Sequence, residues 1–360
     1  MRLLLITRPF VFHGGVERAT AGLIGALVAR GHDVHVLSPG AAVPLAGVTL
    51  HPLGLPRLPA TARLLALALL ARRAVVAGRW DIVQSHERTL CQQVYRAGEG
   101  CHRAYLASGA RTVTRGLYHR VVLALEARVF RRTPAIVAIA RRGKCEIEGL
   151  YGVSPARVTV IYNGVDLERF HPGNRPAHGA SARVEAGIAP ADSVLLFVGS
   201  GFERKGLVTA IQSLPRLGDA RLIVIGRGDE ARYRGLAERL GVDGRVRWLG
   251  LRRDLERWYA AADVLVLPAR YEPFGNVHLE ALASGVPVVT TASAGGSELI
   301  EEGENGAVIP PGDPEALAAA VLGLRSAGWG SLGEAARRSA EPFTYDVQAA
   351  AFERLYRKFP

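Results

Sequence analysis

The chain has 360 residues, of which 49% are hydrophobic and 22% charged, with 41 Gly and 20 Pro. This length suits about two domains and this composition suits a folded globular protein, so a small disulfide-stapled protein and a disordered chain are both excluded. The three cysteines, Cys91, Cys101 and Cys145, have neither CxxC nor Cys/His ligand spacing. We therefore expect no disulfide framework, no zinc site and a cytoplasmic location.

The net charge of +12 is unevenly distributed. Residues 1–165 hold 22 Arg or Lys against 8 Asp or Glu, whereas the remainder holds 23 against 25. Such an excess would attract phospholipid head groups, a phosphorylated glycan or nucleic acid, although a solvated surface in an Arg-rich chain would have the same composition. The longest apolar run, 64–71, is far shorter than the roughly 20 residues that span a bilayer, so any membrane contact is expected to be peripheral.

Short apolar runs with strand propensity alternate with helical patterns along the chain, which is typical of βαβ units and parallel sheets. In the first half, strands are predicted at 3–7, 34–37, 48–51, 82–84, 136–139 and 158–161. Helices are predicted at 17–30, 60–77, 117–131 and 141–150. The segment 171–191 is rich in Pro, Gly and Ala without clear periodicity, and it is interpreted as the boundary between domains, just after a hinge at 163–170.

A second series of the same kind follows this segment. Strands are predicted at 194–198, 222–225, 246–249, 264–267, 286–290 and 307–309, and helices at 207–217, 230–240, 255–262 and 276–284. The pattern indicates an α/β protein with two Rossmann-like domains, residues 1–165 and 166–345, whose parallel sheets face each other across a cleft. A C-terminal helix within 346–360 could pack back on the N-terminal domain.

Three loops at the expected carboxyl ends of strands have the composition of ligand sites. The first holds Gly14 and Gly15, between the first strand and its helix, where missing side chains allow a substrate to approach the backbone. A glycine pair is also a common turn. The second, Gly199–Gly206, places Arg204 and Lys205 beside a glycine-rich turn, and this pair could neutralise a diphosphate leaving group unless it is spent on a surface ion pair with Glu203.

The third loop, EPFGNVHLE, is the most informative. Glu272 precedes the turn at Gly275, and Glu280 falls inside the helix that starts at Asn276. The backbone N–H groups of Gly275, Asn276 and Val277 would form an anion seat at the helix start. A carboxylate on each side of that seat suggests that Glu272 binds a sugar ring and Glu280 a ribose.

These motifs resemble a known family. The segment EPFGNVHLEALASGVPVVTT, with SGFERKG, YNGVDLERF and HGGVER, resembles the retaining glycosyltransferases of GT-B fold, which include glycogen synthases and phosphatidylinositol mannosyltransferases, and within them the family 4 (group 1) type. The resemblance covers residues 1 to about 345. GSGFERKG and RAGEGCHRAYL are similar more narrowly to the lipopolysaccharide core glucosyltransferases that act on inner-core heptose.

The resemblance implies roles for particular residues. It assigns donor binding to Gly15, Arg169, Arg204, Lys205, Glu272, Gly275, Asn276, Val277 and Glu280. It assigns catalysis to Glu99, Arg204, Lys205 and Glu272. Glu99 stands where the core glucosyltransferases tend to have an aspartate near the reacting carbon. His13 and His102 are candidates for contact with the acceptor, His102 because it lies close to Glu99 in the chain.

The expected reaction is transfer of a hexose, as glucose from UDP-glucose, to a hydroxyl of a lipopolysaccharide core or related lipid-linked glycan, with retention of anomeric configuration. No D-x-D motif follows a predicted strand, so no metal and no cofactor besides the nucleotide sugar are expected. The expected partners are the donor, an anionic glycan or glycolipid acceptor and the inner face of an anionic membrane. The oligomeric state is not predicted.

Three alternatives stay open on the sequence alone. A nucleotide-sugar 2-epimerase would share this fold. The pattern G-x-G-x-x-A at 226–231 could mark an NAD-dependent dehydrogenase, but no acidic residue ends the following strand at 246–250. Nucleic-acid binding would rest on the charge of the first half alone, without a recognition module, and is not expected.

Overall fold

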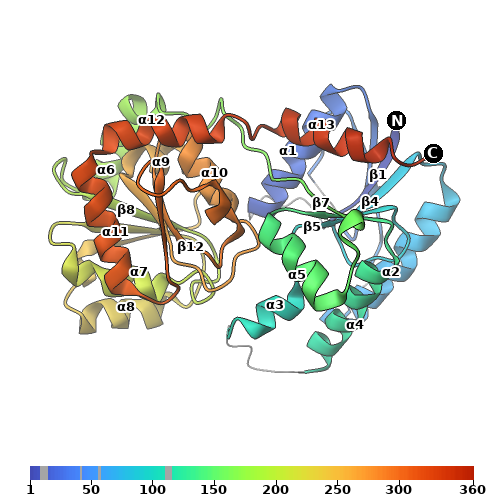
Figure 1. Cartoon of the computed structure of the whole chain (residues 1–360), viewed down its shortest axis with the longest axis horizontal. Coiled ribbons are helices and arrows are strands. Elements are labelled where there is room, and N and C mark those ends of the chain that lie inside the picture. Colours follow the sequence, from blue (N-terminus) through green and yellow to red (C-terminus); the bar gives the residue numbers. More distant parts are fainter. Residues whose placement is uncertain (9–14, 41–42, 56–57, 110–115) are drawn as a thin grey trace. The chain divides into compact units, whose positions relative to one another are not determined.

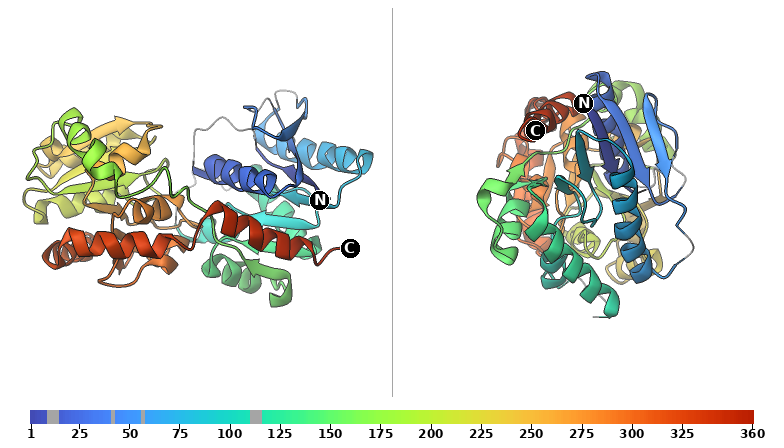
Figure 2. Two further views of the ribbon diagram at one scale, coloured as in Figure 1. Left: turned by 90° about the horizontal axis from the view of Figure 1, so that it is seen from above. Right: turned by 90° about the vertical axis from the view of Figure 1, so that its right-hand side faces the viewer.

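The computed structural model describes residues 1–8, 15–40, 43–55, 58–109 and 116–360. The chain forms two compact units, one made of residues 1–164 together with 345–360 and the other of residues 165–344 (Figure 1). Each unit holds one parallel β-sheet with helices on both faces (Figure 2). The predicted fold class, α/β with two Rossmann-like parallel sheets, is confirmed.

The first unit contains a seven-stranded parallel sheet in the order β3-β2-β1-β4-β5-β6-β7. Its strands are β1 (Arg2–Ile6), β2 (Asp33–Ser38), β3 (Val48–Pro52), β4 (Ile82–Ser85), β5 (Val94–Ala97), β6 (Ala135–Ala138) and β7 (Val158–Val160). Its helices are α1 (Gly15–Ala29), α2 (Ala60–Ala77), α3 (His102–Ala107), α4 (Leu117–Arg132), α5 (Arg141–Tyr151), the 3-10 turn η1 (Pro155–Arg157) and α13 (Tyr345–Tyr356).

The central strand β1 is apolar from Leu3 to Ile6 because both faces of the sheet are covered. Leu3 and Leu5 belong to the core under α1 and α13, whereas Leu4 and Ile6 belong to the core on the opposite face, under α2. Phe352 of α13 is fully buried in the first of these cores. The end of the chain is therefore an integral part of the first unit.

The second unit contains a six-stranded parallel sheet in the order β10-β9-β8-β11-β12-β13. Its strands are β8 (Val194–Val198), β9 (Arg221–Ile225), β10 (Val246–Gly250), β11 (Val264–Leu267), β12 (Val288–Thr291) and β13 (Gly306–Ile309). Its α-helices are α6 (Ala180–Glu185), α7 (Leu207–Ser213), α8 (Glu230–Arg239), α9 (Leu255–Ala261), α10 (Asn276–Ala283), α11 (Pro314–Ala327) and α12 (Trp329–Ala340). Short helical turns are η2 (Arg175–Gly179), η3 (Leu214–Arg216), η4 (Asp243–Arg245) and η5 (Gly295–Leu299).

The segment 171–191 is not the boundary between domains, and that interpretation was wrong, because the second unit begins at Val165. It folds into η2 and α6 inside the second unit, where Arg175 and Arg183 both bind the buried carboxylate of Asp263. A Cβ on Gly179 would lie 2.7 Å from the carbonyl oxygen of Ala260. The Gly and Ala content that resembles a linker thus serves close packing against α9.

Candidate active site

Three of the predicted residues of the second unit, Arg204, Lys205 and Glu272, lie in loops that follow β8 and β11. The loop from β8 to α7 carries Arg204 and Lys205, and the loop from β11 to α10 carries Glu272. Because β8 and β11 are neighbours in the sheet, the loops at their carboxyl ends lie side by side.

An ion-pair cluster joins the two loops. Lys205 Nζ lies 2.7 Å and Arg204 Nη1 2.9 Å from Oε2 of Glu272, which is 8% exposed. Burial alone would raise the pKa of this carboxyl, but the ammonium and the guanidinium outweigh it and lower the pKa to about 2. The cluster is therefore ionised at neutral pH, with one positive charge in excess.

Arg204 and Lys205 do not form an ion pair with the neighbouring Glu203. Glu203 forms its ion pair with Arg232 at 3.1 Å. The surface pair with Glu203, the alternative that the sequence left open, is therefore not formed. Arg204 and Lys205 both contact Glu272 instead.

Glycines at the ends of β8 and β9 make room for this cluster. A Cβ on Gly199 would lie 2.3 Å from Cδ of Lys205, and a Cβ on Gly226 would lie 2.2 Å from the carbonyl oxygen of Gly199. A Cβ on Gly228 would lie 2.3 Å from the ring of Phe202. The glycines of the G-x-G-x-x-A pattern are thus explained by packing against the β8–α7 loop, without a dinucleotide.

The start of α10 supplies backbone donors next to the cluster. Gly275 is the N-cap residue with φ of +81°, a conformation that favours glycine, and a Cβ there would lie 3.0 Å from Cγ of Glu272. Gly275 itself has no side chain that could cap the helix. The start of α10 therefore presents the positive end of its dipole next to the cluster, and the anion seat at residues 275–277 stays a prediction.

His278, which the sequence analysis did not single out, holds this turn in place. It is fully buried, with Nδ1 2.7 Å from the carbonyl oxygen of Gly275 and Nε2 2.8 Å from Oγ1 of Thr290. Since a carbonyl only accepts, Nδ1 carries the proton. The Thr290 hydroxyl lies between Nε2 and the carbonyl oxygen of Leu267, 3.1 Å away, and its one proton can serve either acceptor. Burial lowers the pKa of His278 to about 4, so the ring is neutral at physiological pH.

Glu280 and Arg169 are both tied to α9. The 7% exposed Glu280 accepts a hydrogen bond of 2.9 Å from the hydroxyl of Tyr259. Arg169 donates through Nε and Nη2 to Glu256 and through Nη2 to the carbonyl oxygen of Arg253. Arg169 is thus paired with Glu256 and is not a member of the ion-pair cluster of Arg204, Lys205 and Glu272.

In the first unit, Glu99 lies between two arginines that the sequence analysis missed. It pairs with Arg8, which follows β1, and with Arg88, which follows β4, at 3.2 Å. Burial would raise the pKa of Glu99, but the two guanidinium groups lower it below its ordinary value. A basic residue shortly after two adjacent strands was the sequence signal that could have found this pair.

A small pocket beside Glu99 contains a buried cation. Arg96, 2% exposed, donates to Oδ1 of Asn163 at 2.6 Å, and among the described residues its Nε has no hydrogen-bond partner. Burial lowers its pKa to about 10. His86 lines the same pocket, and burial, helped by Arg96 and Arg8, holds its pKa well below the ordinary value. The pocket therefore has a neutral imidazole and buried positive charge.

Three further predicted residues, Gly15, His13 and His102, belong to the first unit. Gly15 begins α1, and His13 lies outside the described residues. His102, at the start of α3, shares a contact of 2.9 Å between its Nε2 and Nδ1 of His119. Burial is the main reason that the pKa of His102 is lowered.

Comparison with known families is decisive for the class of protein. Residues 13–169 match the model described as Glycosyltransferase Family 4, and residues 192–326 match the model described as Glycosyl transferases group 1. The chain belongs to the family 4, or group 1, glycosyltransferases. The glycosyltransferase was therefore identified correctly from its motifs.

Curated relatives match this glycosyltransferase over different lengths. An uncharacterised glycosyltransferase of Methanocaldococcus jannaschii is 28% identical over 340 residues, covering 88% of this chain and 87% of the relative. D-inositol 3-phosphate glycosyltransferase 2 of Catenulispora acidiphila is 34% identical over 61% of this chain and 55% of its own. A lipopolysaccharide core biosynthesis glycosyltransferase of Rhizobium meliloti is 42% identical over 37% of this chain and 39% of its own. The chain thus spans less than two thirds of the length of these last two, 55% and 39%.

Solved structures share the fold along the whole chain. WaaG, a glycosyltransferase involved in lipopolysaccharide biosynthesis, has a TM-score of 0.85 at 24% identity, covering 98% of this chain and 99% of its own. HepE of Anabaena, in complex with UDP and glucose, has a TM-score of 0.78 at 18% identity and full coverage of both chains.

Two further observations concern ions and membranes. Within the described residues, no group of three or more His, Cys, Asp or Glu side chains is arranged to hold a metal ion. No helix in the same part of the chain has both the length and the apolar character needed to cross a bilayer.

Proposed function

We propose that this glycosyltransferase transfers glucose from UDP-glucose to a hydroxyl of an anionic glycan, such as a lipopolysaccharide core or related lipid-linked acceptor, with retention of configuration. The observation that carries the proposal is the cluster of Lys205, Arg204 and Glu272 beside the N-terminal end of α10. This arrangement offers concentrated, oriented positive charge and is suited to a diphosphate.

When the donor binds, its diphosphate would replace Glu272 as a partner of Lys205 and Arg204. Its diphosphate takes hydrogen bonds from Lys205, Arg204 and the amides of residues 275–277, while Glu272 turns its free oxygen to hydroxyls of the transferred sugar. Glu280, fixed by Tyr259, binds the ribose hydroxyls. Gly15 allows close approach to the diphosphate, and Arg169 contributes a further cation near the donor. Glu272 holds both cations in position before the donor arrives, which lowers the cost of reorganisation.

The leaving group gains negative charge as its bond to the anomeric carbon breaks. In the proposed mechanism Lys205, Arg204 and the α10 dipole stabilise that charge, so no metal ion is required. The acceptor oxygen forms its bond on the same face of the sugar, and its proton passes to the departing phosphate oxygen. Glu99, held anionic by Arg8 and Arg88, stabilises the positive charge that develops on the sugar.

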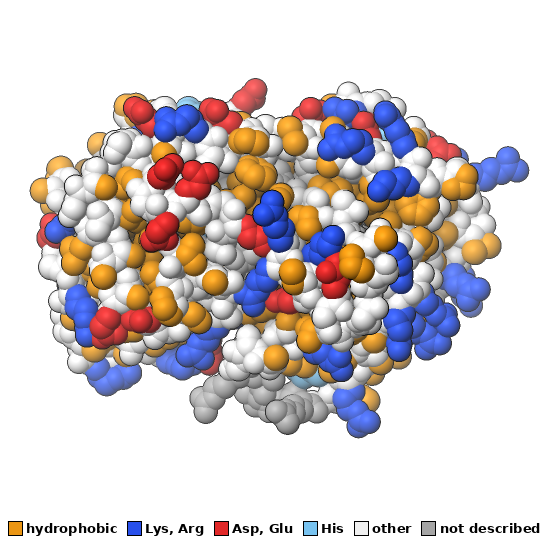
Figure 3. Space-filling model, viewed as in Figure 1, with side chains coloured by type: hydrophobic (Ala, Val, Ile, Leu, Met, Phe, Trp, Pro, Cys, Tyr) orange, Lys and Arg blue, Asp and Glu red, His pale blue; other side chains and the backbone are white. Residues whose placement is uncertain are grey.

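The acceptor is inferred from charge and from the names of relatives. The first 165 residues hold 22 basic against 8 acidic residues, and basic side chains gather on the first unit in the view of Figure 3. One relative is named for inositol 3-phosphate and another for the lipopolysaccharide core. A phosphorylated glycan at the inner surface of an anionic membrane agrees with these observations.

The test is incubation with UDP-, GDP- and ADP-sugars, with and without lipopolysaccharide core acceptors, in the presence of EDTA. We expect acceptor-dependent transfer from UDP-glucose, with NMR of the product showing the anomeric configuration of the donor. Turnover of the free donor to a 2-epimer would instead support the epimerase alternative. Transfer that requires added Mg²⁺ would contradict the mechanism.

A further inference from the structure

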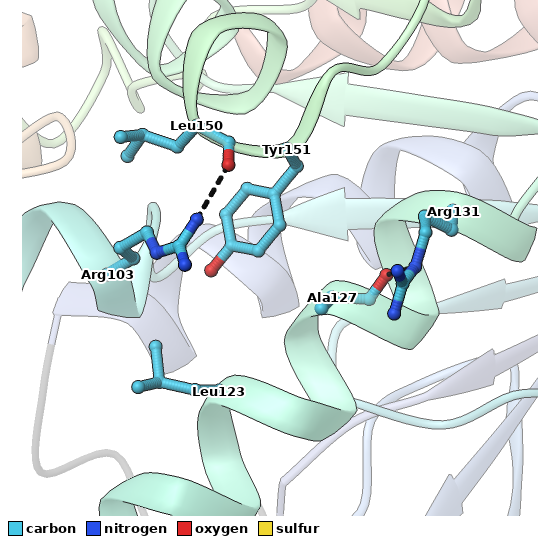
Figure 4. A pocket seen from close by; sticks show the side chains of 6 residues that line it. All are labelled: Arg103, Leu123, Ala127, Arg131, Leu150 and Tyr151. Atoms are coloured by element: carbon cyan, nitrogen blue, oxygen red, sulfur yellow. Dashed lines mark hydrogen bonds between the residues drawn. The ribbon is translucent and has the colours of Figure 1, made fainter.

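A pocket of about 220 Å³ opens among α3, α4 and α5 of the first unit, and none of the residues assigned above lines it (Figure 4). It is lined by Arg103, Leu123, Ala127, Arg131, Leu150 and Tyr151. The leucines and the alanine give it an apolar wall, and the two arginines approach it from different helices. Its volume is too small for a large cofactor and suits a ligand about the size of one sugar unit.

Both arginines are held in place without being neutralised. Nη1 of Arg103 donates to the carbonyl oxygen of Leu150 at 2.8 Å, and its guanidinium lies 5.5 Å from the ring centroid of Tyr151. Nε of Arg131 donates to the carbonyl oxygen of Ala127 at 3.2 Å. No carboxylate in the described ranges forms an ion pair with Arg103 or Arg131. Each guanidinium has five N–H donors, so most of them stay available to a ligand.

A buried network links this pocket to Glu99. The hydroxyl of Tyr151 donates to Glu126, which is 1% exposed. Glu126 also pairs with Arg88 at 3.1 Å, and Arg88 pairs with Glu99 at 3.2 Å. The pocket and Glu99 are therefore held at a fixed separation within one unit. A single ligand that reaches both must be extended.

We infer that this pocket binds a phosphorylated sugar of the acceptor, and this inference rests on the proposed function. The phosphoryl group lies between Arg103 and Arg131, whose planar forks match its oxygens, and the sugar ring lies against Leu123 and Leu150. The acceptor is then an oligosaccharide whose phosphate is some residues away from the accepting hydroxyl.

Binding can be tested on the full chain without a donor. The full chain, labelled at its leucine methyl groups, is titrated with glucose 6-phosphate, inorganic phosphate or glucose. The methyl signals of Leu123 and Leu150 are followed by NMR. We expect saturable shifts with glucose 6-phosphate, weaker saturable shifts with inorganic phosphate and none with glucose. Absence of saturation with glucose 6-phosphate, or equal shifts with glucose, would overturn the inference.

Matched variants separate a built site from general attraction. Arg131→Gln should weaken glucose 6-phosphate binding about tenfold, because it removes one charge-assisted contact. Arg128→Gln removes the same charge from an exposed position of α4 that does not line the pocket, and it should change affinity less than twofold. Equal weakening by both variants would show non-specific attraction and refute the site. Among the residues that the structure describes, the Arg131 side chain bonds only to Ala127 in its own helix, so the variant should fold, and circular dichroism verifies this.

Transfer assays connect the site to the acceptor. The wild-type enzyme should have a KM about tenfold lower for a phosphorylated core acceptor than for the same acceptor after phosphatase treatment. In Arg131→Gln this ratio should approach one, whereas Arg128→Gln should keep it. A ratio unchanged in Arg131→Gln would overturn the assignment to the acceptor. If the protein bound glucose 6-phosphate but transferred no sugar, the proposed function would fail while the anion site stood.

Discussion

At the scale of single residues, the account depends on how charges are paired around Glu272. Two cations share one of its carboxylate oxygens, and this contact keeps all three side chains in place. Removing the acid would leave Lys205 and Arg204 without the partner that positions them, and breaking a buried ion pair in this way is costly. The sugar would also lose its proposed contact.

We therefore expect Glu272→Ala to lower kcat/KM for the donor by tenfold or more. The matched control is Glu203→Ala in the neighbouring loop. In the described part of the chain the Glu203 carboxylate forms an ion pair only with the exposed Arg232, so this variant should change kcat/KM less than twofold. Steady-state kinetics with varied UDP-glucose provide the measurement. A loss below tenfold in the Glu272 variant would contradict the role given to this residue.

The lowered pKa of His278 leads to a prediction of how the free energy of unfolding depends on pH. Its pKa falls from 6.5 in the unfolded chain to about 4 in the fold, so below pH 6.5 the unfolded state binds a proton that the folded state does not. The free energy of unfolding should then decrease by about 2 kcal/mol between about pH 7 and pH 5, on the scale of 1.36 kcal/mol per pKa unit.

Denaturant unfolding at several pH values measures this dependence. The decrease should be much smaller in His278→Asn, and His178→Asn in the same unit should keep it. The pairing of Glu272 adds a separate loss below about pH 4.5, because its pKa in the fold is lower than in the unfolded chain. A wild-type profile that is flat from pH 7 to pH 5 would exclude the buried neutral histidine.

Several site residues could be predicted from the sequence, but their contacts could not. Glu272, Arg204 and Lys205 stand next to glycine-rich turns after apolar strands, which marks them as ligand residues. Arg8 and Arg88 are distant in sequence and both reach Glu99 because β1 and β4 pair, so their positions after strands mark them only as candidates and do not reveal the contact. The same holds for the link from Tyr151 to Glu126, which requires helix packing.

At the scale of elements, most strands were predictable because their residues are apolar and bounded by turns. Strand β5 (Val94–Ala97) was missed, since it is short and contains the buried Arg96 in place of an apolar residue. Helices α11 and α12 were missed although both bury apolar residues at helical spacing, Leu317, Val321 and Leu324 in α11 and Leu332, Ala336 and Ala340 in α12. The sequence also left open where α13 packs, because that depends on a complementary surface on α1.

The β8–α7 loop offers a test at this scale. A methyl group at Gly199 would occupy the path of the Lys205 side chain, at 2.3 Å from Cδ, and would force the ammonium away from Glu272. Gly199→Ala should raise the KM for UDP-glucose about tenfold. Gly244→Ala, at a position with no heavy atom within 4 Å, is the control and should leave that KM within twofold. Equal KM values in the two variants would contradict the positioning of Lys205 by the loop.

At the scale of the whole molecule, the two units differ in charge, and this difference matches the division of labour that we propose. The excess of basic residues lies within residues 1–165, and the exposed ones, such as Arg72, Arg73 and Arg128, are open to screening by salt. The cluster that would hold the donor is buried in the second unit and should be screened much less.

Ionic strength should therefore affect the two substrates differently. Raising salt from about 50 mM to about 300 mM shortens the screening length below 10 Å and should increase the KM for an anionic acceptor several-fold. The KM for UDP-glucose should change by less than twofold. Steady-state kinetics at constant pH measure both, and an equal response of the two substrates would contradict an acceptor that is attracted by the first unit.

The most direct test of the central claim is a crystal structure with UDP-glucose bound, from crystals grown in EDTA. We predict that the diphosphate lies within hydrogen-bond distance of Lys205 Nζ, an Nη atom of Arg204 and the amides at the start of α10, with Glu272 on the glucose hydroxyls. A diphosphate bound elsewhere, or binding that occurs only when a divalent metal replaces EDTA, would contradict the account.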